Sequence, residues 1–385
     1  MKLGCVVAYS DTHNNYGTYL QDFAMITALQ KMGFECEIIR YKKHLTWLQK
    51  IKLVFLMYRC HGVMDKYREV KEKINLKKHK KYAQNISIRT KSVFAYKLKY
   101  LKPLFKEYDG YDMLCKNSLN YDAVIVGSDQ LWTPLSLYSN FYNLMFVDDS
   151  VRKISYATSF GVSKIPKFQY KATAFFLDRF YRISVREASG KRIVDTLSKN
   201  KAKIVVDPTM LLTPEEWRHE ISVSNVKVNG KYIFCYFLGK NHEARAAANK
   251  LKQKTGLKII AIRHMDEYVK YDEKFGDYAP YDVNPNDFVN LISKAEYVCT
   301  DSFHCSVFSI LFKRKFMTFY RFNSSSKSSR NTRIDNLLSL FNIQERLYQG
   351  NIDLIFNEIN YHEVHNRLDL LRKDSFGFLA ESLKQ

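Results

Sequence analysis

The stretch Thr300–Ser309 places an aspartate, a serine and a histidine together between two apolar runs. If residues 296–300 form a strand and the next run a helix, Ser302 falls at the helix N-cap and His304 in the first turn. Free backbone N–H groups at a helix start attract anions, and a histidine there can bind an anion or act as a general acid near neutral pH. The alternative is that Asp301 and Ser302 only cap the helix while His304 packs beneath a loop.

Polar residues also follow other apolar runs, where they could meet the same ligand. The candidates at these positions are Asn15, Gly17, Ser128, Asp129, Ser159 and Arg186. Asn15 and Gly17 open a helix and could hold a ligand against backbone amides. Asp129 could accept a proton from a hydroxyl group, or could simply cap a helix or loop. The guanidinium of Arg186 fits a carboxylate or phosphate, although the neighbouring Glu187 could instead make it a structural ion pair.

The pattern of apolar residues predicts the elements that carry these side chains. Residues 2–9 resemble a buried strand, residues 20–31 a helix that Gly33 ends, and residues 35–41 a second strand. This order predicts a right-handed β-α-β unit with parallel strands. Further strands are expected at residues 121–127, 153–158, 182–185, 231–239, 257–265, 296–302 and 315–320. In open α/β sheets, ligands bind at the carboxyl ends of the strands, where the candidate residues lie.

The length of 385 residues favours two domains. We expect an α/β fold with two Rossmann-like domains facing a cleft, and an amphipathic C-terminal helix packing back onto them. The predicted domains are residues 1–205, with a basic helical insert at about 45–115, and residues 206–350. Residues 351–385 are predicted to form the helical tail, because Leu368, Phe378 and Leu379 need a partner surface.

The formal net charge is +22, and residues 41–100 hold seventeen Lys or Arg against three acidic residues. This charge is consistent with nucleic acid, an anionic membrane or a small anionic substrate as partner, or with a solvated helical face. Val70 and Ile74 recur at helical spacing and are expected to pack that helix onto the domain. Residues 51–60 are apolar, but Lys52 and Arg59 exclude a membrane span. The N-terminus lacks a signal-peptide pattern, so a cytoplasmic protein is expected.

Seven segments, taken in order, resemble the polysaccharide pyruvyl transferase family. They are His13–Gln21, Val124–Trp132, Ile154–Gly161, Ile183–Gly190, Asp207–Leu212, Thr300–Ser309 and Thr332–Leu338. The resemblance implies a glycosyltransferase-B-like pair of Rossmann domains. It also implies transfer of pyruvate from phosphoenolpyruvate to a sugar, as a ketal that bridges two hydroxyls of a surface-polysaccharide unit.

The same resemblance assigns residues to the donor site. The family's phosphoenolpyruvate-binding arginine falls on Arg186, and its histidine falls on His304. Some members carry an arginine two residues before that histidine, where this chain has Ser302. Part of the anion binding must then come from elsewhere, and Arg333 or Arg330 is the candidate. His304 could protonate the donor, and Asp129 could accept a proton from the acceptor hydroxyl.

The expected partners are phosphoenolpyruvate, a nucleotide- or lipid-linked sugar acceptor and, through the basic segment, the anionic inner face of a membrane. No metal or redox cofactor is expected, because the transfer needs none and the sequence has no metal-spaced cluster. One alternative is a glycosyltransferase that uses a nucleotide sugar on the same fold. The alternative from another class is a basic nucleic-acid-binding protein. We favour the transferase without nucleic acid, because the polar residues concentrate at the strand ends.

Overall fold

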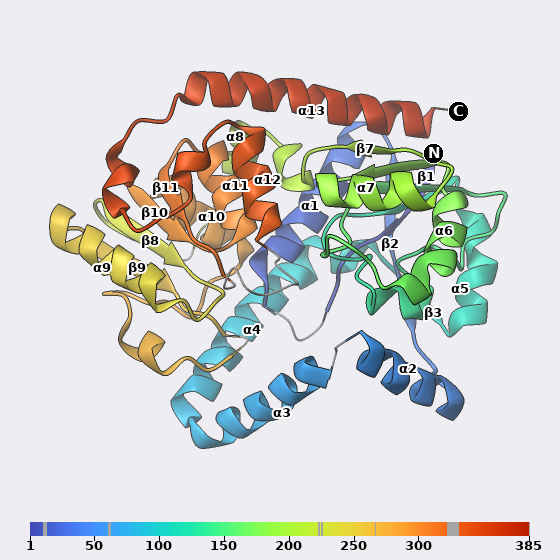
Figure 1. Cartoon of the computed structure of the whole chain (residues 1–385), viewed down its shortest axis with the longest axis horizontal. Coiled ribbons are helices and arrows are strands. Elements are labelled where there is room, and N and C mark those ends of the chain that lie inside the picture. Colours follow the sequence, from blue (N-terminus) through green and yellow to red (C-terminus); the bar gives the residue numbers. More distant parts are fainter. Residues whose placement is uncertain are drawn as a thin grey trace.

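Two parallel β-sheets, each flanked by helices, form the framework of the molecule (Figure 1). The structure is a computed structural model that describes residues 1–10, 14–60, 63–221, 224, 226–265, 267–321 and 331–384. All strand pairings in both sheets are parallel. The arrangement is the predicted one, with two Rossmann-like units in a glycosyltransferase-B-like fold.

The first sheet has seven strands in the order β3-β2-β1-β4-β5-β6-β7. Their bounds are β1 Lys2–Val6, β2 Glu35–Lys42, β3 Phe105–Asp109, β4 Ala123–Val126, β5 Arg152–Thr158, β6 Arg182–Val185 and β7 Ala202–Ile204. The order runs outward in both directions from the β1/β4 pair, so the switch point of the sheet lies between these two strands. Loops that leave the carboxyl ends of β1 and β4 therefore border the crevice where such sheets bind ligands.

Helices α1 (Tyr16–Lys31), α5 (Tyr111–Asn117), α6 (Tyr170–Asp178) and α7 (Ala188–Leu197) accompany the first sheet. Helix α1 ends where predicted but begins at Tyr16, four residues before the apolar periodicity, for clear local reasons. Asn15 caps its start by accepting a hydrogen bond from the backbone N–H of Gly17. After the C-cap, Gly33 has a φ of 87°, which glycine adopts without steric cost.

The second sheet has four strands in the order β11-β10-β8-β9. They are β8 Tyr232–Tyr236, β9 Lys258–Ile262, β10 Tyr297–Thr300 and β11 Lys315–Thr318. Its helices are α9 His242–Thr255, α10 Pro285–Lys294, α11 Phe303–Leu311 and α12 Thr332–Leu340, with α8 Pro214–Glu220 in the connection from the first sheet. One apolar core joins the two sheets, since Leu3 of β1 and Phe234 of β8 belong to the same buried cluster.

The C-terminal helix α13 (Tyr361–Leu383) packs back along both units, as predicted (Figure 1). At its start, the Tyr361 hydroxyl donates to the Arg314 carbonyl beside β11. Further along, the Ser375 hydroxyl accepts from the backbone N–H of Val206, and Glu381 pairs with Arg182 at 3.1 Å. Arg182 is the first residue of β6, so the end of α13 lies at the amino ends of the strands.

The basic insert consists of α2 (Trp47–Arg59), α3 (Val63–Lys78) and α4 (Lys80–Tyr100). Its helical part is shorter than the predicted 45–115, because Phe105–Asp109 forms edge strand β3. Helix α4 ties the two units together, since the buried Arg89 donates from Nε to the Tyr281 carbonyl at 2.8 Å.

Helix α3 does not bury the apolar side chains that were expected to pack it onto the domain. Val70 and Ile74 are 55% and 47% exposed. This expectation was wrong because α3 extends away from both sheets, as Figure 1 shows, and meets the body through a polar contact in which Glu72 accepts from the backbone N–H of Tyr268. None of the helices in the described part of the chain has both the length and the apolar character required to cross a bilayer.

Candidate active site

Polar side chains from the carboxyl ends of β4, β5, β6 and β7 meet the starts of α1, α11 and α12. The first sheet contributes Ser128, Asp129, Ser159, Arg186, Glu187 and Asp207. The facing helix starts contribute Asn15, Gly17, Ser302, His304 and Arg333. Every residue in the predicted site therefore lies at this junction between the two units. Arg330, the alternative to Arg333, lies outside the described residues.

Arg186 lies at the centre of an ion-pair cluster. Its side chain is 2% exposed, with Nη1 2.9 Å from Asp207, Nη2 3.4 Å from Asp129 and Nε 3.6 Å from Glu187. Burial alone would lower the pKa of Arg186, but Asp207, Asp129 and Glu187 raise it above its usual value. The structural ion pair considered from the sequence is thus present. Nε still lacks a hydrogen-bond partner.

Asp207 links Arg186 to His304. Its carboxylate is fully buried and lies 3.7 Å from Nε2 of His304. The Thr209 hydroxyl donates to Oδ1 at 2.7 Å, and the Ser128 hydroxyl donates to Oδ2 at 3.2 Å. Burial would raise the pKa of Asp207, but His304, Arg186 and Thr209 hold it well below its ordinary value. Asp207 is therefore a carboxylate that balances the charge of the cations around it.

His304 lies in the first turn of α11, as the sequence predicts, and is 6% exposed. Ser302 caps this helix by accepting from the backbone N–H of Cys305. Asp301 instead accepts from the backbone N–H groups of Leu238 and Gly239, at 2.6 and 2.7 Å, so its role is structural. Nε2 of His304 is buried without a hydrogen-bond partner among the described residues, which distinguishes it from a satisfied core histidine.

Gly17 allows the imidazole of His304 to lie against the start of α1. A Cβ atom at position 17 would lie 2.0 Å from Nδ1 of His304, which no real contact permits. Asn15, beside it, is occupied as the N-cap of α1. The starts of α1 and α11 therefore lie against one another at the junction.

Asp129 is ionised and held in place by its neighbours. Its backbone has a φ of 75°, its Oδ2 accepts from the Thr18 hydroxyl at 3.2 Å, and its Oδ1 faces Arg186. Burial would raise its pKa, but Arg186, His304 and Arg333 lower it below the ordinary value. This makes Asp129 a weak base. Ser159 is engaged in another way, because its hydroxyl donates to the Glu187 carboxylate.

Arg333 forms no ion pair with any described residue, although the carboxylates of Asp129 and Glu187 attract it from farther away. Among the described residues, no hydrogen bond or ion pair reaches its guanidinium, and its Nε is buried without a partner. Burial, followed by repulsion from Arg186, lowers its pKa to about 9, so it remains charged at neutral pH. Both guanidinium groups lie near the ring of Phe303, at 5.0 Å for Arg186 and 6.0 Å for Arg333.

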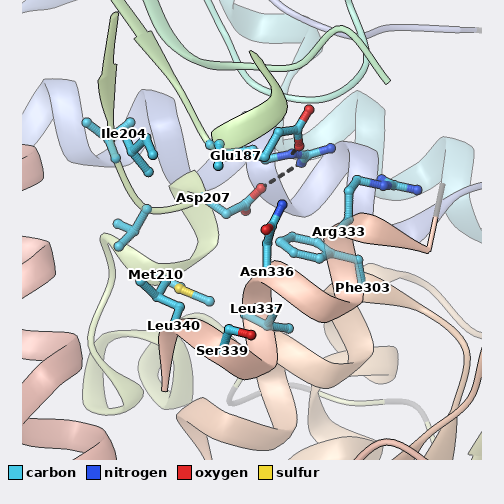
Figure 2. A pocket seen from close by; sticks show the side chains of 14 residues that line it. Glu187, Ile204, Asp207, Met210, Phe303, Arg333, Asn336, Leu337, Ser339 and Leu340 are labelled. Carbon is cyan, nitrogen blue, oxygen red and sulfur yellow. Dashed lines mark hydrogen bonds and ion pairs between the residues drawn. The ribbon is translucent and has the colours of Figure 1, made fainter. Parts of the chain in front are cut away.

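Arg333 and Arg186 line one cavity of about 250 Å³ between the two units. Figure 2 shows Phe303, Arg333 and Asn336 facing Glu187 and Asp207 across it. The complete lining is Arg186, Glu187, Ala188, Ile204, Val205, Val206, Asp207, Met210, Phe303, Arg333, Asn336, Leu337, Ser339 and Leu340. His304 is not part of this lining, but its Nε2 lies 3.7 Å from Asp207, which is. An uncompensated cation beside a small cavity favours an anionic ligand.

Asp207 and Glu187 belong to this site but were absent from the residues predicted for it. Each lies within a motif read from the sequence, Asp207–Leu212 and Ile183–Gly190. The available signal was therefore their position directly after apolar runs, the same signal that singled out Asp129. Their role became visible only once strand order placed β6 and β7 beside the start of α11.

Two parallel Rossmann-like units with a cationic site between them define the glycosyltransferase-B-like architecture. The family model described as polysaccharide pyruvyl transferase matches residues 15–323, which is most of the chain. The chain belongs to that family. A search of curated proteins gave no match.

Solved structures of similar fold are distant in sequence. UDP-GlcNAc 2-epimerase from Neisseria meningitidis is 10% identical, with a TM-score of 0.47, and the match covers 98% of this chain and 99% of that one. ADP-heptose lps heptosyltransferase II from E. coli is 9% identical, with a TM-score of 0.34 and coverage of 98% and 100%. A DNA-modifying β-glucosyltransferase is 10% identical, with a TM-score of 0.40 and full coverage of both chains.

Proposed function

We propose that this transferase moves the pyruvyl group of phosphoenolpyruvate onto a pair of hydroxyls of a nucleotide- or lipid-linked sugar, forming a ketal. The observation that carries the proposal is Arg333, a buried cation that forms no hydrogen bond or ion pair with the described residues, at a cavity that it shares with Arg186. Phosphoenolpyruvate carries a carboxylate and a phosphate. These anionic groups match a guanidinium fork and two facing helix starts.

The size of the cavity supports a small donor. Its volume of about 250 Å³ lies below the range of about 300–1,000 Å³ that is usual for drug-sized ligands. A nucleotide sugar, the alternative donor, would also need surfaces for its base and ribose. The acceptor sugar is proposed to approach from the region of Asp129 and the start of α1, on the other side of Arg186.

The transfer requires a proton, a nucleophile and a leaving group. His304 gives a proton to the methylene carbon of the donor, while a sugar hydroxyl oxygen bonds to the adjacent carbon. Asp129 accepts the hydroxyl proton as that bond forms, since its lowered pKa makes it too weak a base to remove the proton beforehand. The oxygen of a second hydroxyl then bonds to the same carbon as the bond from that carbon to the phosphate oxygen breaks, and its proton leaves with the phosphate, which closes the ketal. Arg333 and Arg186 stabilise the charge on the leaving phosphate.

The test is phosphate release from phosphoenolpyruvate, measured across a panel of nucleotide- and lipid-linked sugars, with the ketal identified in the product by NMR. Acceptor-dependent phosphate release together with a ketal product supports the proposal. Sugar transfer from a nucleotide sugar, with phosphoenolpyruvate left unconsumed, would establish the alternative donor. A thermal-shift comparison of phosphoenolpyruvate with nucleotide sugars separates the two donors before an acceptor is known.

A further inference from the structure

Helix α2 exposes an apolar face that no described part of the chain covers. None of its thirteen residues is buried. Six large apolar side chains on it are between 46% and 73% exposed: Trp47, Leu48, Ile51, Val54, Phe55 and Tyr58. At about 100° per residue these positions fall within one arc of about 120°, so they form a continuous stripe along the helix. We call this stripe the α2 face. Soluble proteins rarely leave such a stripe open to water.

The opposite side of α2 attaches the helix to the first unit. The Tyr138 hydroxyl donates to the Gln49 carbonyl at 2.6 Å, and Arg59 lies 3.9 Å from the ring centroid of Phe168. Leu56 lines a cavity together with residues of this same region, including Tyr138 and Phe168. A capping box formed by Thr46 and Gln49 fixes the start of the helix. These contacts fix which side of α2 packs on the first unit, so the α2 face points away from the protein.

The residues that border the α2 face are basic. Lys50 lies on one side of the stripe, and Lys52 and Arg59 lie on the other. The α2 face has aromatic residues near both ends, Trp47 and Tyr58. Basic residues flanking an apolar face, with aromatic residues at its ends, are typical of helices that lie in the interface of an anionic bilayer. The surrounding segment 41–100 adds the same charge, with seventeen Lys or Arg against three acidic residues.

We infer that α2 docks the protein onto an anionic lipid bilayer by burying the α2 face at the headgroup boundary, with Lys50 and Lys52 at the phosphates. An apolar protein partner would leave these flanking cations without counter-ions.

The position of α2 also determines which side of the molecule would face the bilayer. It follows the carboxyl end of β2, whereas the end of α13 lies at the amino ends of β5 and β6, so the two helices lie on opposite sides (Figure 1).

A bilayer bound at α2 is therefore on the side toward which the carboxyl ends of the strands point. This orientation suits an acceptor carried by a lipid, a consequence that rests on the proposed function. The docking of α2 on a bilayer does not rest on the proposed function, and its test uses no donor or acceptor.

The test is co-sedimentation of the full chain with vesicles of phosphatidylglycerol and phosphatidylcholine in equal parts, at about physiological ionic strength. We expect the wild type to pellet with these vesicles and not with phosphatidylcholine alone. Phe55→Glu should lower the partition coefficient at least about tenfold, because it removes the burial of one large apolar side chain. Leu370→Glu is the matched control. Leu370 is 70% exposed on α13, away from α2, so the Leu370→Glu variant should pellet like the wild type.

The fluorescence of Trp47 tests insertion without any charge-introducing variant. Trp47 is 73% exposed, whereas the other two tryptophans, Trp132 and Trp217, are fully buried. Binding to anionic vesicles should shift the emission to shorter wavelength and protect it from acrylamide. Trp47→Phe should remove this shift.

Four results would overturn the inference. The first is a wild type that stays in the supernatant, and the second is pelleting with no change in Trp47 emission, which indicates contact by lysines alone. The third is equal pelleting of Phe55→Glu and the wild type. The fourth is a dimer in gel filtration that Phe55→Glu dissociates, which would assign the α2 face to a second copy of the chain.

Discussion

Arg186 and Arg333 share one cavity but differ in electrostatic environment. Arg186 is neutralised by three carboxylates, which raise its pKa, whereas burial and Arg186 itself lower the pKa of Arg333. An arginine held without a counter-ion destabilises the folded protein, because its charge is less favourable there than in water. The arrangement is understandable if a bound anion supplies the missing charge. We therefore assign the larger part of donor binding to Arg333, with Arg186 holding the carboxylates in place.

Arg333→Gln should separate stability from activity. The variant loses a poorly solvated charge, so its free energy of unfolding should equal or exceed that of the wild type in urea denaturation. Its kcat/KM for phosphoenolpyruvate should fall at least about tenfold, because a charge-assisted contact is lost. A variant that unfolds more easily yet keeps its kcat/KM would remove Arg333 from the donor site.

His304→Gln tests the proton donor. Loss of a positioned general acid should lower kcat by about two to four orders of magnitude. Stability should change little, because Nε2 of His304 makes no hydrogen bond in the folded protein. Turnover and thermal melting, measured on the same preparation, check both statements. Early melting with full specific activity would show that His304 only fills the interface.

Asp207→Asn should be destabilising in a pH-dependent way. Removing one partner of a buried ion pair costs about 3–5 kcal/mol. Because the folded-state pKa of Asp207 is lowered, its contribution is present above the unfolded pKa of about 3.9 and is lost as pH falls further. Urea denaturation of both proteins should give a constant difference from neutral pH to about pH 5, which shrinks below pH 4. A difference that grows on acidification would contradict this assignment.

At the scale of elements, the starts of α1 and α11 define the site, and Gly17 sets how closely they approach. Gly17→Ala would place a Cβ atom 2.0 Å from His304, so the imidazole must move. We expect a loss of kcat comparable to that of His304→Gln, measured by the same assay. Gly377→Ala is the control, since position 377 on α13 has open space and should gain about 1 kcal/mol of stability. Wild-type turnover in Gly17→Ala would show that the position of His304 does not matter for catalysis.

The elements that the sequence predicted well carry strong local signals. Helix α1 has Asn15 at its start and Gly33 after its end, and the central strands are continuous apolar runs. Strand β3 was missed because FKEYD is short and polar, as an edge strand can be. The exposed face of α3 was misjudged because periodicity predicts an amphipathic helix but does not show whether a partner surface exists.

The candidate site was predictable only in part for a related reason. Each strand end shows its own polar residues in the sequence, which sufficed for Asp129, Arg186 and His304. The ion pairs among them depend on strand order and on how the two units face each other. The sequence suggested Glu187 only as a possible ion-pair partner of Arg186, and Asp207 entered the site only through the structure, as did the contrast between Arg186 and Arg333.

At the scale of the whole molecule, the two units share structure and should unfold together. One buried cluster contains residues of both sheets, and α13 contacts both units. Calorimetry should show a single transition. Leu379→Ala should lower stability by about 2–5 kcal/mol and keep that single transition, because the fully packed Leu379 lies in the shared core. Two resolved transitions in the wild type would contradict this coupling.

The central claim is that an anionic three-carbon donor binds at Arg333. It is tested most directly by calorimetric titration of phosphoenolpyruvate into the wild type, into Arg333→Gln, and into the wild type with UDP-GlcNAc present. No acceptor is needed for this measurement. The account predicts that phosphoenolpyruvate binds the wild type, that Arg333→Gln weakens this binding at least about tenfold, and that UDP-GlcNAc does not compete for the site. Equal affinity of phosphoenolpyruvate for both proteins, or no binding to the wild type, would contradict it.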